Sequence, residues 1–362
     1  MTDTANLNMY RSTAPCKIDY EHNILEVDSY RNQTLAINDI GQVVAWGQGY
    51  YADGSDSMKT HEYPTVISGI TDPAAVSRGK NHNLVLDKNG DVWGRGSNTN
   101  NPMGTLGGKV KTVTKLSGIS NVKQIAAGTE FSLFLKNDGT LWGVGKNTGG
   151  QLGQGNTVNY SSPVQITDRD DFIKVSVGES YAAALTSDGI YTWGSGILGV
   201  LGRGNSVRTS LIPEKVNITL ESGDSFVDVI AGMKFCLALT SKGYIYIWGD
   251  NDSGVYGRGN TSQTYMPARV GGLSNIVSID AAPHSIVAVN KSGAVYSWGY
   301  GYDGQLGYEA TSKYYPSRVS ALNGKNIKSV TCGYDFTVAI SESGELYTFG
   351  SRLSEPLGFY TS

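Results

Sequence analysis

All six tryptophans of this chain occupy one position of a repeating unit, and this constrains the fold more than any other feature of the sequence. Each is followed directly by glycine, and Phe349-Gly350 supplies a seventh aromatic-glycine pair. The steps between successive pairs are 47 to 55 residues long. Such a period indicates an array of similar supersecondary units. The six tryptophans are Trp46, Trp93, Trp142, Trp193, Trp248 and Trp298.

The third unit shows what each unit contains. Segments 122–128 and 131–135 predict two strands, and Leu141-Trp142-Gly143 begins a third after a hairpin turn at Asp138-Gly139. A fourth strand is predicted to open near a proline, as at Pro163, and to be outermost because proline cannot donate to a ladder. In all seven units a glycine follows four residues after the aliphatic residue that closes the second strand: Gly41, Gly90, Gly139, Gly189, Gly243, Gly293 and Gly344.

Seven four-stranded antiparallel units predict one all-β domain over 1–362, a seven-bladed β-propeller. The last unit has too few residues for its own fourth strand, whereas 15–18 read as an orphan copy of that strand. We therefore expect an N-terminal strand at about 15–18 to complete the last blade and close the ring. The alternative, an open β-solenoid, would leave two apolar end faces uncapped. The expected units are 24–70, 75–119, 122–168, 172–220, 226–273, 276–322, and 327–358 plus 15–18.

The sequence offers no catalytic, cofactor or metal motif in the right context. The segments 194–199 and 299–304 match a dinucleotide fingerprint, but neither opens a helix. No histidine pair has metal-ligand spacing, and His82 is expected to be a frame residue. We predict no enzyme activity, no cofactor and no metal. The three cysteines are expected to be free thiols: Cys16, Cys236 and Cys332.

Charge and composition limit the classes of molecule that the chain is expected to bind. The net charge is -3 with no basic stripe, so nucleic acid is not expected. The sequence has no signal peptide and no apolar membrane span, so we expect no membrane contact and a cytoplasmic protein, or one in a virion assembled in the cytoplasm. The remaining partner class is another protein or protein assembly; the sequence leaves the oligomeric state open.

The residues that differ between units supply the candidate binding surface. Strand direction places the turn after each first strand on the same rim as the loop that follows each aromatic-glycine pair. Tyrosines crowd these loops, and tyrosine is enriched at protein interfaces. The candidate protein-binding residues on this rim are Tyr50, Tyr51, Lys80, Asn81, Glu130, Glu179, Met233, Lys234, His284, Tyr300, Tyr302, Tyr334 and Asp335.

The repeat resembles that of the regulator of chromosome condensation family. The resemblance is carried by Ala126-Ala127-Gly128, by Leu141-Trp142-Gly143, by Gly150-Gln151-Leu152-Gly153 and by proline-led strands such as 213–216, and it extends from about residue 15 to 358. The first unit departs from it, since Tyr30 stands where glycine is expected. The resemblance implies a seven-bladed propeller. It does not imply one function, because one fold hosts many activities.

Known members of that family include an exchange factor for a small GTPase, an inhibitor of β-lactamases and a plant ultraviolet photoreceptor. This chain begins without a basic tail, and it has no tryptophan outside the repeat register for light sensing. The sequence favours a non-catalytic protein-protein interaction propeller, a structural or adaptor subunit of a larger assembly such as a phage virion. The alternative is a free regulatory binder, an enzyme inhibitor or a GTPase exchange factor, that uses the loop rim.

Overall fold

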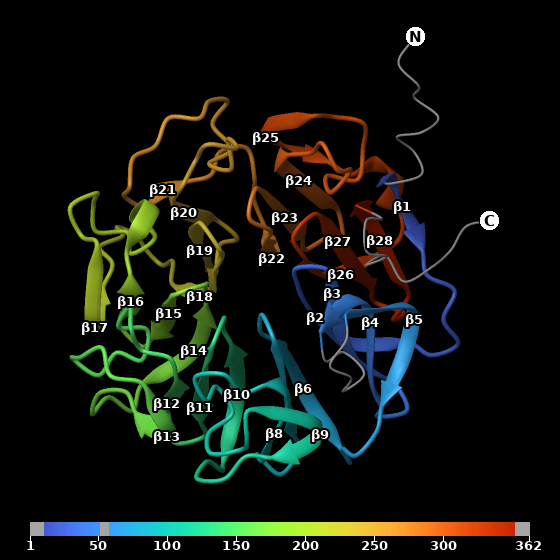
Figure 1. Ribbon diagram of the computed structural model, residues 1–362. Coiled ribbons are helices and arrows are strands. Elements are labelled where there is room, and N and C mark those ends of the chain that lie inside the picture. Colours follow the sequence, from blue (N-terminus) through green and yellow to red (C-terminus); the bar gives the residue numbers. More distant parts are fainter. Residues whose placement is uncertain (1–10, 51–57, 352–362) are drawn as a thin grey trace.

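The computed structural model describes residues 11–50 and 58–351. These residues form seven four-stranded antiparallel sheets, arranged as blades around a central axis (Figure 1). The predicted seven-bladed all-β propeller is therefore confirmed. In the described part of the chain the helices are two short 3₁₀ segments, η1 (Ile197–Gly199) and η2 (Ser320–Leu322), and no helix there could span a membrane.

The strands occupy four radial positions. The innermost strands are β2 (Ile24–Tyr30), β6 (Pro73–Arg78), β10 (Val122–Ala127), β14 (Phe172–Val177), β18 (Phe226–Ala231), β22 (Ile276–Ala281) and β26 (Ile327–Cys332). The second strands are β3 (Gln33–Asn38), β7 (His82–Asp87), β11 (Phe131–Lys136), β15 (Tyr181–Thr186), β19 (Phe235–Thr240), β23 (Ser285–Asn290) and β27 (Phe336–Ser341).

The third strands carry the aromatic-glycine pairs. They are β4 (Val43–Tyr50), β8 (Val92–Ser97), β12 (Leu141–Gly145), β16 (Gly189–Ser195), β20 (Ile245–Gly249), β24 (Val295–Tyr300) and β28 (Leu346–Ser351). The outer strands are β5 (Met58–Ile67), β9 (Lys109–Lys115), β13 (Tyr160–Gln165), β17 (Thr209–Lys215), β21 (Ala268–Arg269), β25 (Ser312–Arg318) and β1 (Arg11–Lys17).

The ring closes through the N-terminal strand, as the sequence predicts. β1 pairs antiparallel with β28, with Ser12 opposite Gly350 and Cys16 opposite Thr348. The strand starts at Arg11, earlier than the expected 15–18, because Pro15 lies inside it at a shift in register between Ser12 and Cys16. The first and last parts of the chain thus share one sheet.

The sequence predicts that each outer strand begins near its proline. In most of the other blades that predicted start is wrong. The prolines of β13, β17 and β25 lie within the strand, in the interval where the pairing with the third strand shifts register. A residue without an N–H can occupy an edge strand at such an irregularity. Only in β21, which is two residues long, does the strand begin directly after its proline.

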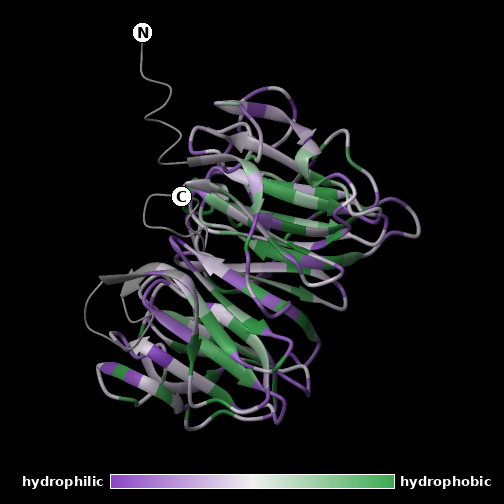
Figure 2. Ribbon diagram, turned by 90° about the vertical axis from the view of Figure 1, so that its right-hand side faces the viewer, coloured by the Kyte–Doolittle hydropathy of each residue, from purple (hydrophilic) through white to green (hydrophobic). Residues whose placement is uncertain are grey.

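The apolar core is divided among the junctions between blades. Seven clusters of buried side chains lie there, and each combines residues of two consecutive blades. Figure 2 shows apolar residues concentrated along the strands. Because each blade buries its faces only against its neighbours, no blade has a complete core of its own.

Hydrogen bonds explain why tryptophan recurs at the same position of the repeat. The fully buried Trp193, Trp248 and Trp298 each donate the indole N–H to a carbonyl in the glycine-rich loop of the preceding blade. Phe349 cannot donate, and there Thr337 Oγ1 donates to the carbonyl at the matching loop position, at 3.1 Å. The accepting carbonyls belong to Gln151, Val200, Val255 and Gln305, in that order.

Two tryptophans differ from this arrangement. Trp93 and Trp142 pack against the core of the preceding blade, but they are only half-buried. Trp93 donates to Asp87 Oδ2 at 2.9 Å and Trp142 to Thr140 Oγ1 at 3.0 Å, both within their own blade. These two rings thus pack between blades, whereas their indole groups contribute no bond between blades.

We predict that Trp248→Phe lowers the free energy of unfolding by about 1–3 kcal/mol, because the buried carbonyl of Val200 loses its donor. Denaturant titration measures this. Trp142→Phe is the matched control, because its indole bonds a half-exposed hydroxyl in the same blade. Equal losses in both variants would contradict the role of the inter-blade bond.

Candidate functional site

The innermost strands surround a central channel with a cavity of about 250 Å³, lined by residues from all seven blades. Polar side chains facing this channel accept backbone N–H groups from the next blade. Asp28 accepts from Arg78 at 2.7 Å, and Asp280 accepts from Cys332 at 2.7 Å. The further acceptor and amide pairs are Glu26 with Val76, Ser77 with Ala127, Gln124 with Val175 and Ser176 with Ala231.

These channel acids titrate in an unusual range. Burial raises the pKa of Asp28 to about 6 and that of Asp280 to about 7, although the backbone hydrogen bonds act to lower both. The charge of Asp28 raises the pKa of Asp280 further. The channel is thus lined by carboxylates that hold neighbouring blades together. Burial and the charge of Asp280 raise the pKa of the Cys332 thiol, so the thiol beside this carboxylate stays protonated. Each acid lies about fifty residues before the residue whose amide it accepts, and this spacing is the sequence signal that could have revealed them.

We call the rim formed by the turns after the innermost strands and the loops after the third strands the loop rim. The turns between second and third strands form the opposite rim, the turn rim. The contact of Lys146, which follows β12, with Glu130 in the turn after β10 at 2.6 Å shows that these two sets of loops meet. This is the arrangement that strand direction predicts.

On the loop rim the structure gathers five of the predicted residues from three consecutive blades. His284 lies edge-on to Tyr300 and to Tyr334, at ring-centre distances of 6.1 and 6.3 Å. Tyr300 stacks on Tyr302 at 6.3 Å, and Lys234 Nζ lies 3.4 Å from His284 Nε2. We call these five residues the His284 cluster: Lys234, His284, Tyr300, Tyr302 and Tyr334.

Ser253 and Asp303, which the sequence did not single out as site residues, lie beside this cluster and the predicted Asp335. Ser253 Oγ lies 3.0 Å from His284 Nδ1. Burial and the charge of Lys234 lower the pKa of His284, so the imidazole is neutral at pH 7. Burial, and then the charge of Asp303, raise the pKa of Asp335 to about 6. Ser253 and Asp303 follow aromatic-glycine pairs, which is the signal that could have found them.

The remaining predicted residues make other contacts. Arg31 and Glu179 approach to 3.9 Å, joining the first and fourth blades at the channel mouth, where Met233 also lies. Lys80 and Asn81 are half-buried and bond the frame through their backbone. Tyr50 is the last residue of β4, and Tyr51 lies outside the described residues.

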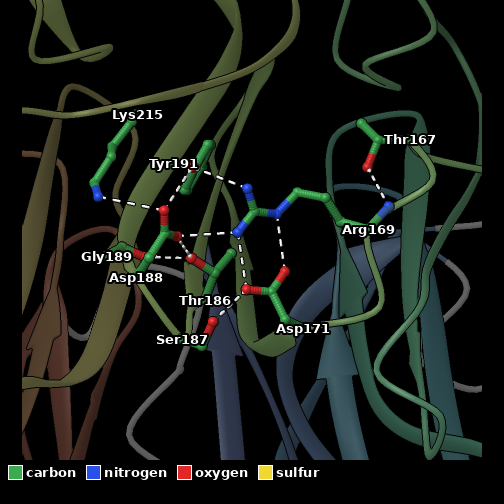
Figure 3. A network of polar contacts seen from close by, with 9 residues as sticks. All are labelled: Thr167, Arg169, Asp171, Thr186, Ser187, Asp188, Gly189, Tyr191 and Lys215. Carbon is green, nitrogen blue, oxygen red and sulfur yellow. Dashed lines mark hydrogen bonds and ion pairs between the residues drawn. The ribbon is translucent and has the colours of Figure 1, made fainter.

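A denser polar network lies on the turn rim (Figure 3). Arg169 bonds both carboxylate oxygens of Asp171 at 2.8 Å, donates to Tyr191 and to Asp188, and stacks on the Tyr191 ring at 4.6 Å. A hydrogen bond from Thr186 lowers the pKa of Asp188 to about 2. The guanidinium is occupied by partners within the chain, so this network secures the segment between the third and fourth blades.

Other residues weighed in the sequence belong to the frame. His82 is buried, and its Nε2 lies 2.9 Å from Ser132 Oγ of the next blade, as expected of a frame histidine. All three cysteines are free. Within residues 11–50 and 58–351, no three His, Cys, Asp or Glu side chains lie close enough together to hold a metal ion.

Comparison with known proteins now identifies the family. The family model described as the RCC1-like domain matches residues 76–362. The chain belongs to this family. Among curated relatives of this RCC1-like propeller, the ultraviolet-B receptor UVR8 of Arabidopsis thaliana is 33% identical over 208 residues, which are 56% of this chain and 47% of the receptor. The human E3 ubiquitin-protein ligase HERC2 is 32% identical over 215 residues, 56% of this chain and 4% of the ligase.

Each of these two matches spans less than half of the relative's own length. Among solved structures, human WBSCR16 has a TM-score of 0.78 at 21% identity, covering 93% of this chain and 89% of that one. Prp20p of Saccharomyces cerevisiae has a TM-score of 0.72 at 22% identity, covering 91% and 82%. These likenesses show the RCC1-like propeller fold.

The channel acids predict an unusual pH dependence of stability. Since the pKa values of Asp28 and Asp280 are raised in the folded state, their protonation favours folding. Their contribution is present near pH 4 and is lost as the pH rises through 6 to 7. We expect Asp280→Asn to raise the melting temperature at pH 8 and to flatten its decline between pH 5 and 8.

Asp138→Asn is the control for this measurement. Asp138 lies in an exposed hairpin turn, and hydrogen bonds from Thr140 lower its pKa, so this variant should keep the parent's slope between pH 5 and 8. A parent melting temperature that stays constant over this range, or an unchanged slope in Asp280→Asn, would contradict the assignment.

Proposed function

We propose that this RCC1-like propeller is a non-catalytic module that docks on another protein through its loop rim, as a structural or adaptor subunit of a larger assembly such as a phage virion. The observation that carries the proposal is the His284 cluster. Its Tyr300 and Tyr302 side chains are 36% and 49% exposed, at positions that the repeat leaves variable. The predicted site residues outside the cluster are proposed as secondary contacts around it.

The chemistry of this surface suits protein binding. Tyrosine offers a large contact area with a polar tip and loses little conformational entropy, because it has only two side-chain torsions. The rings of the His284 cluster already support one another. The cluster is also mounted on a ring whose blades are joined by buried hydrogen bonds, so binding would require little reorganisation of the frame.

The non-catalytic part of the proposal rests on how the polar groups of the channel are used. Asp28, Asp280 and Gln124 are each engaged with the backbone of the next blade. Lys174 and Asp228 form an ion pair between the fourth and fifth blades at 2.5 Å. Groups committed to these bonds are poor candidates for proton transfer to a substrate.

A free regulator is the second candidate. The structure of Prp20p is described together with its binding to Gsp1p and histones, and a further structure shows Kap60 bound to the same yeast protein. At 22% identity this likeness carries the fold, so it supports only the capacity of such a propeller to present a rim to proteins. A regulator would use the same loop rim.

Photo-crosslinking tests the docking surface. With p-benzoylphenylalanine at Met233 or Tyr302 on the loop rim, we expect covalent adducts to one or a few partner proteins in extracts of the native source. The same group at Asn89 or Ser292, which are exposed on the turn rim, is the control and should give none. Adducts formed only from the turn rim would contradict the proposal.

Sedimentation of the native protein separates the two candidates. A structural subunit should sediment with a large particle at fixed stoichiometry, and particle assembly should fail without it. A free regulator should sediment mostly alone or in an equimolar complex.

A further inference from the structure

Asp335 lies on the loop rim, and no cation among residues 11–50 and 58–351 pairs with its half-buried carboxylate. Within the described part of the chain this carboxylate makes no hydrogen bond or ion pair, while Glu130 pairs with Lys146 and Glu179 with Arg31. It is half-buried, so it has lost part of its hydration. A desolvated, unpaired carboxylate gains more from an incoming cation than a hydrated one does.

The surface beside Asp335 is aromatic and carries more negative than positive charge. The rings of Tyr300 and Tyr302 stack with 27° between their planes. The charges of Asp303 and Asp335 both act on Tyr300, and those of Asp250 and Asp252 act on His284. Among the described residues, Lys234 is the cation whose charge acts on His284.

The chain itself shows what such a combination binds. On the turn rim, Arg169 lies over the Tyr191 ring while its guanidinium bonds Asp171 (Figure 3). In the fifth blade, Arg269 lies 3.4 Å from the centre of the Tyr244 ring and bonds Glu221 at 2.7 Å. Both sites place one guanidinium between a tyrosine face and a carboxylate.

We propose that the loop rim binds an arginine side chain of the partner protein, with the guanidinium stacked on the Tyr300–Tyr302 pair and its N–H groups directed at Asp335. The inference rests on the proposed function, and it names the partner side chain that would hold the two proteins together. A planar guanidinium can stack and donate two parallel hydrogen bonds, whereas an ammonium cannot do both. Lysine is therefore the weaker fit.

Short peptides test this without knowledge of the partner. The probe is the capped peptide Gly-Gly-Arg-Gly-Gly, and the comparison peptides carry lysine or uncharged citrulline in place of arginine. Two-dimensional NMR spectra of protein labelled with ¹⁵N-tyrosine report binding, and Tyr300→Phe, Tyr302→Phe and Tyr334→Phe assign the three signals. We expect the arginine peptide to shift these signals saturably, the lysine peptide to bind more weakly, and the citrulline peptide to have no effect.

Point variants distinguish the loss of the arginine-binding site from the loss of the fold. Asp335→Asn should weaken binding of the arginine peptide roughly tenfold, the order expected for a lost hydrogen bond to a charged group. Glu179→Gln, which alters a paired acid on the same rim, should leave binding unchanged. The tyrosine signals outside the cluster should remain in place in both variants, which shows that the fold is intact. Parent binding should also weaken as the pH falls below 6.

The outcomes distinguish this inference from the proposed function. Equal shifts with the arginine and citrulline peptides, or full affinity in Asp335→Asn, would overturn the arginine anchor, while crosslinks from Met233 and Tyr302 would still support docking on the loop rim. Crosslinks only from the turn rim would overturn the proposed function itself.

Discussion

The structure depends on one interaction more than on any other: a side chain on the innermost strand of one blade accepts an N–H group from the innermost strand of the next. Asp28 with Arg78 and Asp280 with Cys332 are the clearest cases. Farther from the axis, indole groups such as that of Trp248 bond a carbonyl of the preceding blade. Apolar clusters fill each junction between these two radii, and the pairing of β1 with β28 completes the ring.

This organisation determines where function can lie. The channel is lined by groups already engaged between blades, and the interiors of the blades are packed. The variable residues left to contact another molecule are those of the two rims and of the exposed outer strands, such as Tyr315. On the turn rim the most connected cation, Arg169, is bound by acids of its own chain. On the loop rim, the Asp335 carboxylate has no cation among the described residues and Tyr300 is partly exposed, which is why the proposals concern that surface.

The fold could be predicted because the same local sequence pattern recurs seven times at a period of about fifty residues, so each unit supports the interpretation of the others. The hairpin glycines illustrate this, since all seven predicted ones adopt positive φ, between 75° at Gly243 and 143° at Gly189. Strand ends were predicted less well, because a proline inside β1 or β13 shifts the register without ending the strand. The half-buried position of Trp93 also depends on its neighbours rather than on the repeat.

The candidate site was predictable only as a set of positions. The alternating direction of successive strands places His284, Tyr300 and Tyr334 on one rim. Their ring contacts, however, depend on how loops from neighbouring blades meet. The unpaired state of Asp335 depends on the absence of a cation nearby among the described residues, which no spacing in the sequence encodes. Likewise, the high pKa of Asp280 follows from burial in a channel that exists only once the ring has closed.

Hydrogen exchange of the protein alone and with its crosslinked partner tests the central claim, that a closed frame leaves the loop rim free to bind. In the free protein, the amides of Arg78, Ala127 and Cys332 should exchange as slowly as global unfolding permits. With the partner, new protection should appear at residues 233–234, 300–303 and 334–335, while the frame amides keep their rates. Rapid exchange of the frame amides in the free protein, or new protection confined to the turn rim, would contradict the account.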